Sequence, residues 1–330
     1  MSAAPVPVVF DTDVGTDVDD ALALALALGS PEIDLRAVSV VNGDVALLDL
    51  RARIAARLLG LAGRSDVPVL RGHPARLSAS DRYTHLGHEG EGLLDVPFSG
   101  DDAPILAEHG ADWLIAESRR EGLQVVATGP FTTVAVALQR DPSLATRLRG
   151  LSVMGGMVHP ENFSPYWQRW LREPGNRGER LDYNTACDPL AALVCAESGV
   201  PMTWVTIEIT LRTGMTRAAL SALRNAGTPF CDALARLTAI WAERFYRHEA
   251  HDLPGTVANY HDPLAMASVL GGPWLSLREE SLRYAVESGL FVARPAVAAD
   301  EGARRAAVSV GVDSAAFESF WLSRVLPVGA

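Results

Sequence analysis

Five aspartates stand close together near the N-terminus, in the segment PVPVVFDTDVGTDVDDALALALAL. The segment begins as an apolar β-branched run and ends as a helical pattern, so the carboxylates follow a strand and precede a helix. In an open parallel sheet, ligands bind at the carboxyl ends of the strands. Because these side chains repel one another and offer only oxygen, they favour calcium or magnesium over zinc. The sequence therefore predicts a metal site that includes members of the set Asp11, Asp13, Asp17, Asp19 and Asp20.

Two other interpretations of this segment remain open. Asp17 or Asp19 would cap the following helix and favour its dipole, which accounts for one or two carboxylates but not for five. Alternatively, Asp11 and Asp13 form the Asp-x-Asp pair of a haloacid-dehalogenase-like phosphohydrolase, as nucleophile and acid. That class of enzyme places a lysine beside the phosphoryl group, whereas all 29 basic residues of this chain are arginines. Metal binding is the first hypothesis and phosphoryl transfer the second.

Two further segments carry groups that suit the same site. In QVVATGPFTTVAVAL, a strand ends before Gly129 and Pro130, and the main-chain carbonyl of Thr128 is a normal type of calcium ligand. In NYHDPLAMA, Asp262 supplies another carboxylate, while His261 can donate a proton near neutral pH. A Gly-Pro turn is common and Asp262 is equally an N-cap, so only the combination is informative.

Two weaker motifs complete the set. In LDYNTACDP, Asp182 and Asn184 flank Tyr183, and in an extended chain this spacing aims both side chains to one side, where they can hold sugar hydroxyls. An asparagine before a helix is equally a cap. GHEGEG places His88 and Glu89 between glycines, as expected of a loop at the rim of a site. By itself, this loop indicates little.

The elements that must position these groups alternate along the chain. Short β-branched runs alternate with helical patterns, which predicts an α/β protein with a buried, mostly parallel, doubly wound sheet. The predicted strands are 6–10, 35–41, 67–70, 123–127, 151–154, 202–205, 283–286, 290–292 and 306–310. The predicted helices are 20–28, 47–61, 111–121, 131–138, 189–197, 216–224, 229–248, 264–270 and 315–325. No linker or repeat divides the chain, so we expect residues 1–330 to form a single domain.

Two long segments, 71–104 and 157–181, interrupt this alternation. Loops of this length inside a compact domain are more often functional than accidental. We expect the second to be an insertion beside the active site. Its Tyr166, Trp167 and Trp170 either cover a ligand or pack on the surface.

The overall composition disfavours several classes of protein. A net charge of -11 argues against nucleic acid polymers as partners, because phosphate neutralisation needs a positive surface. Without lysine, P-loop and Schiff-base enzymes are excluded. Cys187, Cys195 and Cys231 lack the spacing of a zinc cluster, and we expect them to be reduced and buried. Because no signal peptide or membrane-spanning run is evident, we expect a cytoplasmic protein without membrane partners.

Taken together and in this order, the strand-end aspartates, ATGPFT, VMGG, DYN and HDP resemble the inosine-uridine-preferring nucleoside hydrolase family of calcium-dependent N-ribohydrolases. The resemblance runs from Phe10 to about Met266, and the ordered set is far more specific than any one motif. It implies the nucleoside hydrolase fold, an open Rossmann-like sheet. It also implies hydrolysis of the N-glycosidic bond of a ribonucleoside to ribose and free base, by a homodimer or homotetramer.

The resemblance further implies a role for each matching residue. Calcium-activated water would attack the sugar with Asp13 as the general base, and His261 would serve the leaving base. Asp11 would support the loop and the inner carboxylates. The calcium ligands would be Asp13, Asp20, the main-chain carbonyl of Thr128, and Asp262. The substrate contacts would come from Asp19, His88, Met154, Asn162, Asp182 and Asn184.

The chain departs from the commonest pattern of that family. Two additional residues precede the last pair of aspartates, which leaves either Asp17 or Asp19 to contact the ribose. Asp44 stands where many relatives carry a metal-site asparagine, and Asp182 where many carry glutamate, so oxygen ligands are kept at both positions. The insertion at 157–181 is longer than usual, so base preference does not carry over. A non-catalytic nucleoside-binding protein is a third hypothesis, which the presence of Asp13 and His261 disfavours.

Overall fold

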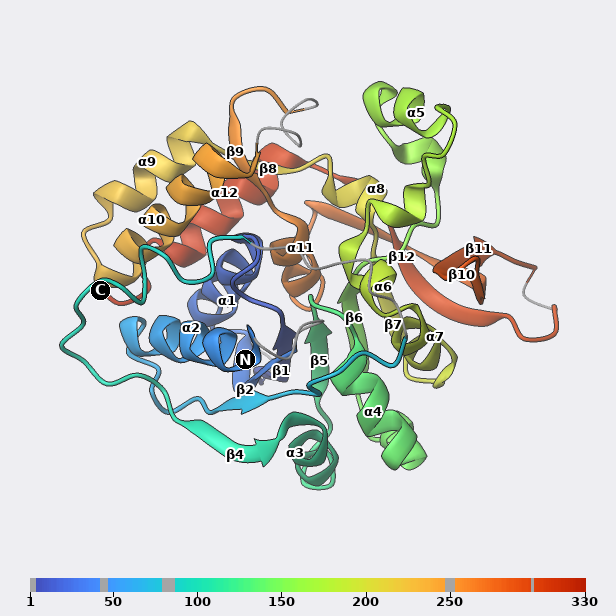
Figure 1. Ribbon diagram of the computed structural model, residues 1–330, viewed down its shortest axis with the longest axis horizontal. Coiled ribbons are helices and arrows are strands. Elements are labelled where there is room, and N and C mark those ends of the chain that lie inside the picture. Colours follow the sequence, from blue (N-terminus) through green and yellow to red (C-terminus); the bar gives the residue numbers. More distant parts are fainter. Residues whose placement is uncertain (1–3, 42–46, 79–86, 247–252, 298–299) are drawn as a thin grey trace.

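A ten-stranded sheet forms the centre of the protein (Figure 1). The structure is a computed structural model that describes residues 4–41, 47–78, 87–246, 253–297 and 300–330. The strands of the sheet are β1 Val6–Thr12, β2 Ile33–Val40, β3 Val69–Arg71, β4 Ile105–His109, β5 Gln124–Ala127, β6 Gly150–Met154, β7 Met202–Val205, β10 Leu275–Glu287, β11 Leu290–Pro295 and β12 Arg304–Val312. Their order across the sheet is β11-β10-β12-β7-β6-β5-β1-β2-β3-β4.

Most neighbouring strands run parallel. From β4 to β12 every adjacent pair is parallel, whereas β10 is antiparallel to both β12 and β11. Helices cover both faces of this sheet, as a buried parallel sheet requires. The predicted class, an open and mostly parallel doubly wound α/β domain, is therefore confirmed.

Side chains of the central strands point alternately to the two faces. In β1, Val8 and Phe10 enter one apolar core and Val9 enters the other. The helices of the first core are α1 Asp19–Gly29, α2 Leu48–Leu61, α9 Arg217–Asn225, α10 Pro229–Arg244, α11 His261–Ala267 and α12 Ser314–Val325. The helices of the second core are α3 Gly110–Glu117, α4 Thr132–Arg140 and α7 Pro189–Glu197.

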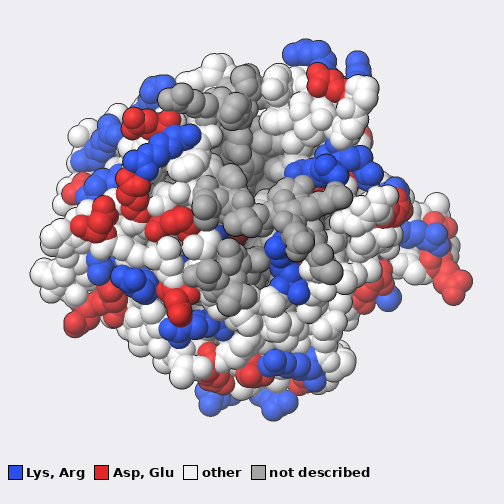
Figure 2. All heavy atoms as spheres, in the orientation of Figure 1, with Lys and Arg blue, Asp and Glu red and all other residues white. Residues whose placement is uncertain are grey.

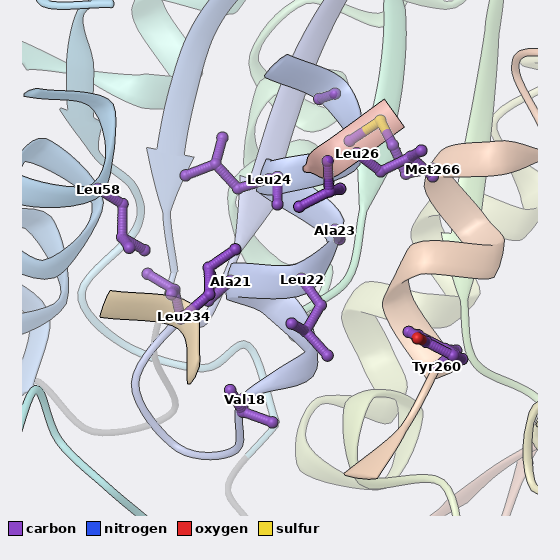
Figure 3. Close-up of a cluster of buried hydrophobic side chains, with 14 of the residues drawn as sticks. Val18, Ala21, Leu22, Ala23, Leu24, Leu26, Leu58, Leu234, Tyr260 and Met266 are labelled. Atoms are coloured by element: carbon purple, nitrogen blue, oxygen red, sulfur yellow. The ribbon is translucent and has the colours of Figure 1, made fainter. Parts of the chain in front are cut away.

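Helix α1 is enclosed by its neighbours. Residues 19–27 are all buried, because the run ALALALAL has no polar face to turn to solvent. Figure 3 shows Leu58 of α2 and Met266 of α11 reaching the apolar cluster that surrounds this helix. Trp321 of α12 donates from Nε1 to the carbonyl of Leu22 at 3.0 Å. These contacts fix the helix whose first turn carries two of the predicted site aspartates.

The order of the strands reverses at β1. The strands β2, β3 and β4 follow one another on one side of β1, and the chain then returns to place β5, β6 and β7 on the other side. In open α/β sheets, ligands bind in the crevice at such a reversal, outside the carboxyl ends of the strands. The short helices α5 Pro165–Leu171, α6 Tyr183–Cys187 and α8 Ile207–Thr210 follow β6 and β7 at this end.

Several elements differ from those predicted. Strand β4 was not expected, because its sequence ILAEH is largely exposed and carries no strand pattern. A second sheet pairs β8 Gly214–Thr216 with β9 Thr256–Asn259, and both strands are too short to leave a period. The predicted strand 283–286 is part of the thirteen-residue β10, and the predicted helix 264–270 begins three residues earlier as α11. The predicted helix 229–248 corresponds to α10, and its last two residues lie outside the described ranges.

The described residues give three further general findings. None of their helices is long and apolar enough to cross a membrane. All three cysteines are buried and free of disulfide bonds. Figure 2 shows acidic and basic side chains mixed over one face, with no broad basic area among the described residues of that face.

Candidate active site

A cavity of about 250 Å³ lies at the carboxyl ends of β1, β5 and β6. Its walls come from segments spread along most of the chain. The lining residues are Asp13, Thr16, Asp17, Asp19, Asp20, Thr128, Met154, Leu181, Tyr183, Asn184, Ile207, Trp241, His261 and Asp262. A larger hollow of about 700 Å³ between α9, α10 and β9 is lined by none of the predicted site residues. The smaller cavity is therefore the candidate active site.

Five carboxylates meet in this cavity. Asp13, Asp19, Asp20 and Asp262 are buried, and Asp17 is half-buried. Carboxylate oxygens of Asp17, Asp19 and Asp20 lie within 4.8 Å of one another, so these three side chains could hold a metal ion. The main-chain N–H of Asp262 donates to Asp19 Oδ2 at 3.4 Å, although the two residues are 243 positions apart. The acidic groups predicted from opposite ends of the chain thus share one site.

Helix capping does not explain these aspartates. The N-cap of α1 is Val18, and no side chain caps that helix. Asp19 and Asp20 lie inside its first turn, where the helix dipole favours negative charge. The N-cap of α11 is Tyr260, while Asp262 lies in the first turn. The carboxylates are therefore available to a ligand in the cavity.

The carboxyl of Asp20 is set between two strands. Its Oδ1 accepts hydrogen bonds from the hydroxyl of Thr12, at the end of β1, and from Thr128 Oγ1 at 2.9 Å, just after β5. Desolvation raises its pKa to about 6, and the charge of Asp17 adds to the rise while the two hydroxyls oppose it. The Asp262 carboxyl is a further hydrogen-bonding neighbour.

Asp13 and Asp262 resist ionisation for the same reasons. Burial raises the pKa of both carboxyls well above the usual value, and the charge of Asp20 raises them further. Asp19 also repels the Asp262 carboxylate. Such a group of buried like charges is stabilised by a cation placed among them. The electrostatics therefore fit a positively charged ligand, and the all-oxygen donor set fits a hard metal ion.

Asp11 supports the site from behind. It is buried and does not line the cavity. Burial raises its pKa to about 7, while the hydroxyls of Ser39 and Thr133 oppose the rise. Its main-chain carbonyl accepts a hydrogen bond from Thr128 N at 2.8 Å, which joins the ends of β1 and β5.

The carbonyl of Thr128 is held by a side chain from α6. Asn184 Nδ2 donates to Thr128 O at 2.7 Å and to Met154 O at 3.1 Å. The next residue, Gly129, packs against the loop that follows β1. A Cβ added at Gly129 would lie 2.9 Å from Asp13 N and 3.0 Å from Asp13 Cβ. The Gly-Pro turn therefore lets the Thr128 carbonyl and the Asp13 carboxylate approach one cavity.

His261 is the lining imidazole among the described residues. Its Nδ1 lies 2.7 Å from Thr210 Oγ1, at the end of α8. Both His261 and Asp262 belong to the first turn of α11, so one short helix presents a carboxylate and an imidazole to the same cavity. This arrangement suits proton transfer beside a cation site.

The expectation of an extended chain at Asp182 and Asn184 is wrong. Asp182 is the N-cap of α6, where its carboxylate accepts from the N–H groups of Asn184 and Thr185, and Asn184 belongs to the helix. The same carboxylate accepts from Gly156 N at 2.7 Å. Asp182 therefore supports the lining residue Asn184, and its own side chain does not line the cavity.

Two other residues singled out by the sequence, His88 and Asn162, are not among the residues that line the cavity. His88 is buried, with Nδ1 accepting from Gly90 N at 3.1 Å and Nε2 2.9 Å from the carbonyl of Asp17. Desolvation lowers its pKa to about 4, so this imidazole is neutral. Asn162 is half-buried in the turn Pro160–Asn162 and is not among the lining residues. Asp44 lies outside the described residues.

The other wall of the cavity is apolar and was not predicted. It is formed by Leu181, Tyr183, Ile207 and Trp241, from four separate segments. No motif marked them, because apolar and aromatic residues at these positions are indistinguishable from core residues in a sequence. Tyr183 is the exception among these residues, because it lies inside the DYN motif. The cavity lining therefore combines carboxylates with apolar and aromatic side chains, which matches the two halves of a nucleoside.

Fold and cavity together define an α/β protein with an acidic site, at the strand reversal, that could hold a metal ion. The family model described as inosine-uridine preferring nucleoside hydrolase matches residues 8–319. The chain is also 30% identical over 267 residues to the pyrimidine-specific ribonucleoside hydrolase RihA of Salmonella schwarzengrund (strain CVM19633), covering 80% of this chain and 79% of that protein.

Solved structures agree with this relationship. A purine-preferring ribonucleoside hydrolase from Gardnerella vaginalis superposes with a TM-score of 0.80 at 26% identity, covering 98% of this chain and 99% of that one. A plant nucleoside hydrolase has a TM-score of 0.79 at 24% identity over 98% and 99% of the two chains, a likeness of fold. The chain belongs to the inosine-uridine preferring nucleoside hydrolase family. It is a hydrolase, and the bond that it breaks is the N-glycosidic bond of a ribonucleoside.

Proposed function

We propose that the enzyme uses a calcium ion bound by Asp13, Asp20, Asp262 and the main-chain carbonyl of Thr128. The observation that carries this proposal is the meeting of buried carboxylates from both ends of the chain in one cavity. All of these donors are oxygens, as calcium prefers. Asp17 and Asp19 lie beside Asp20 and complete the negative environment.

The ion, when bound, would align the ribose hydroxyls and make a coordinated water more acidic. Asp13 then removes a proton from the attacking water. Its carboxylate suits this task, because it lines the same cavity as the other proposed ligands and can accept a proton when ionised. Around the sugar, the remaining carboxylates would stabilise the positive charge that develops on the ribose as the glycosidic bond breaks.

The ribose would lie against the carboxylates of the cavity. Asp19 and Asn184 line the cavity and offer a carboxylate and an amide to the ribose hydroxyls, with Met154 beneath the sugar ring. Asp17 also lines the cavity, so both candidates for the ribose contact are within reach. Asp182 acts here through Asn184, whose helix it caps.

The base of the nucleoside would lie against the apolar and aromatic lining residues. Tyr183, Trp241 and Ile207 offer flat and apolar surfaces that suit a heteroaromatic ring. His261 would protonate the departing base, and Thr210 fixes the orientation of its ring. The compared relatives include pyrimidine-specific and purine-preferring enzymes, so the base preference of this chain is a matter for measurement.

The test is ribose release from a panel of purine and pyrimidine ribonucleosides, with calcium and with a chelator. We expect calcium-dependent ribose release by the wild-type protein and near-complete loss in Asp13→Ala, because the variant lacks both a ligand and the base. The fold should persist, because removal of one carboxylate from the cluster reduces the electrostatic repulsion in the ion-free protein. More than a tenth of wild-type turnover in Asp13→Ala would refute the role of this residue.

The same assay separates the alternatives. Release of inorganic phosphate from phosphate esters, without ribose release, would favour the phosphohydrolase hypothesis. Nucleoside binding without any product would favour a non-catalytic binding protein. We also propose, on the family relationship alone, a cytoplasmic homodimer or homotetramer, which light scattering on the purified protein would test.

A further inference from the structure

Arg51 is a buried cation on the apolar face of α2. The residues of this helix that turn inward are Leu48, Arg51, Ala52, Ile54, Ala55, Ala56, Leu58 and Leu59. Only 1% of the Arg51 side chain is exposed. A charged guanidinium is costly to bury, so it persists where partners satisfy it. Its partners therefore indicate what it does.

Those partners belong to the catalytic loop that follows β1. Nη1 donates to the main-chain carbonyl of Asp13 and lies 3.3 Å from Oδ2 of the same residue. Nη2 donates to the hydroxyl of Thr16. One planar group thus holds the backbone and the carboxylate of Asp13 together with the next turn of the loop.

Arg51 also reaches segment 87–90, which contains His88. Its Nη2 lies 3.8 Å from Glu89 Oε1. This segment is packed against the catalytic loop, with Glu89 N donating to Gly15 O at 2.7 Å and His88 N to Thr16 O at 3.2 Å. At Gly87, an added Cβ would lie 1.1 Å from Thr16 O, so the two segments touch without space for a side chain.

Arg51 does not touch the substrate. It is absent from the cavity lining, and it contacts the lining residues Asp13 and Thr16. Its positive charge nevertheless acts on the acidic cluster at short range in a buried environment, where charges interact strongly. It can therefore influence the reaction only through the residues that it holds.

We infer that Arg51 is a positioning residue for hydrolysis, which holds the Asp13 carboxylate in the orientation for proton removal and ties the catalytic loop to segment 87–90. This inference rests on the role proposed for Asp13. The three acceptors at Asp13 and Thr16 define the orientation, because a guanidinium fork can serve them at once and a compact ammonium cannot. A loss of this fork displaces Asp13 relative to the bound substrate without removing any group that binds the nucleoside.

The experiment compares Arg51→Met and Arg51→Lys with the wild-type enzyme at saturating calcium, measuring kcat and KM for the best nucleoside of the panel. Misplacement of a catalytic group by about 1 Å costs on the order of 10²-fold. We expect kcat of Arg51→Met to fall about 10²-fold, with KM within about threefold of wild type. Arg51→Lys should lie between the two, because it restores the charge but not the fork.

A readout independent of turnover is calcium titration by calorimetry. We expect Arg51→Met to keep 1:1 calcium binding, since Asp20, Asp262 and the Thr128 carbonyl are unchanged. Two controls are matched to it. Arg53→Met makes the same change at an exposed site of α2, and Leu58→Ala removes a buried side chain about two turns beyond Arg51 in that helix. Both should keep the kcat of the wild type in their folded fraction.

The outcomes that overturn the inference are distinct. A wild-type kcat in Arg51→Met, an equal loss in Leu58→Ala, or a loss of calcium binding in Arg51→Met would each refute it. If Arg51→Met fails to fold, Arg51→Lys decides, and a wild-type kcat there would refute the inference. Failure of the proposed function itself is recognised separately, because the wild-type enzyme would then release no ribose or Asp13→Ala would remain active.

Discussion

At the scale of single residues, His261 offers the sharpest test of the chemistry. Its Nδ1 lies 2.7 Å from Thr210 Oγ1, and the residue lines the cavity. We expect His261→Ala to lower kcat on inosine or uridine by about 10² to 10⁴, the usual value of general acid assistance. Activity on a nitrophenyl riboside should change much less, because that leaving group departs without a proton. Steady-state kinetics on both substrates measures the difference.

Thr210→Val tests the orientation of the His261 ring without removing the imidazole. It removes the hydroxyl that orients the imidazole and keeps a β-branched side chain. Its loss on inosine should be smaller than that of His261→Ala and in the same direction. Equal losses on the two substrates in His261→Ala would contradict the acid role.

Gly129 permits the close contact between two strand ends. An added Cβ would lie 2.9 Å from Asp13 N, which is backbone and has little freedom to yield. We expect Gly129→Ala to displace Asp13 and lower kcat on the order of 10²-fold. Gly311→Ala in β12 is the matched control, because the nearest atom to its Cβ is 3.7 Å away. Wild-type kcat in Gly129→Ala would show that the contact is dispensable.

Sequence reasoning located the acidic groups but not their supports. Oxygen-rich motifs at strand ends reveal ligands by type, whereas Arg51 looks like one more surface arginine until its place in the buried stripe of α2 is noticed. His88 and Asp182 were expected to contact substrate. In the structure, the His88 imidazole and the Asp182 carboxylate each have hydrogen-bond partners in the backbone. Each residue also has one distant partner, Asp17 for His88 and Gly156 for Asp182, and no spacing in the sequence reveals it.

At the scale of elements, α5 carries the aromatic cluster of segment 157–181. Trp167 is buried, its ring centroid lies 5.1 Å from that of Tyr166 and 5.8 Å from that of Trp170, and none of the three lines the cavity. Packing is therefore the described role of this cluster. Leu181, at the end of the segment, is the member that reaches the cavity.

A substitution in α5 should separate stability from catalysis. We expect Trp167→Ala to lower the free energy of unfolding by about 3 to 5 kcal/mol, as for other buried aromatic residues, and to leave kcat of the folded enzyme within a few fold. Urea unfolding and steady-state kinetics measure the two effects. A large fall in kcat with unchanged stability would instead support a covering role for the indole.

The elements that sequence analysis missed share a physical cause. Strand β4 lies at the edge of the sheet and is only partly buried, so it lacks the continuous apolar run of the interior strands. Strands β8 and β9 have three and four residues, fewer than the period-two pattern needs. The start of α11 was placed too late because His261 and Asp262 are polar site residues in a buried first turn.

At the scale of the whole molecule, the acidic cavity couples stability to pH and to metal. The pKa of Asp20 is raised from 3.8 to about 6, and burial raises the pKa values of Asp13 and Asp262 well above their usual value. The ion-free folded state therefore binds protons more tightly than the unfolded chain. The stability of the ion-free protein should therefore fall as the pH rises from about 4 through about 6. Calcium should offset this loss above that range.

Thermal unfolding with calcium or with a chelator, at pH 5 and pH 7.5, measures this coupling. A ligand at 100 times its Kd stabilises the folded state by about 2.7 kcal/mol, so we expect Tm to rise by several degrees at pH 7.5. The rise should be smaller at pH 5, where protons compete for the carboxylates. Asp262→Asn is the control and should abolish most of the calcium effect. A calcium-dependent rise equal at both pH values would contradict the linkage.

The overall architecture was predictable because it depends on repetition. Buried parallel strands produce apolar runs, and intervening helices produce a 3.6-residue period, so the open doubly wound sheet follows from the pattern. The joining of Asp13 and Thr128 at one edge followed from the rule that strand carboxyl ends share a side. Asp262 does not follow from this rule, because it lies on α11 after β9 of the second sheet. The antiparallel β10 and β11 broke the pattern, since half of β10 is exposed and reads as polar.

The position of α11 has a consequence during protein synthesis. Four of the five lining carboxylates lie in the first twenty residues, whereas Asp262 arrives on α11, and the α12 residue Trp321 that binds the α1 backbone comes later still. A nascent chain therefore carries most of the carboxylates of the cavity for nearly the whole of translation without a finished site. Hydrolytic competence should arise abruptly, once the final fifth of the polypeptide has left the ribosome and closed over the oldest part of the chain.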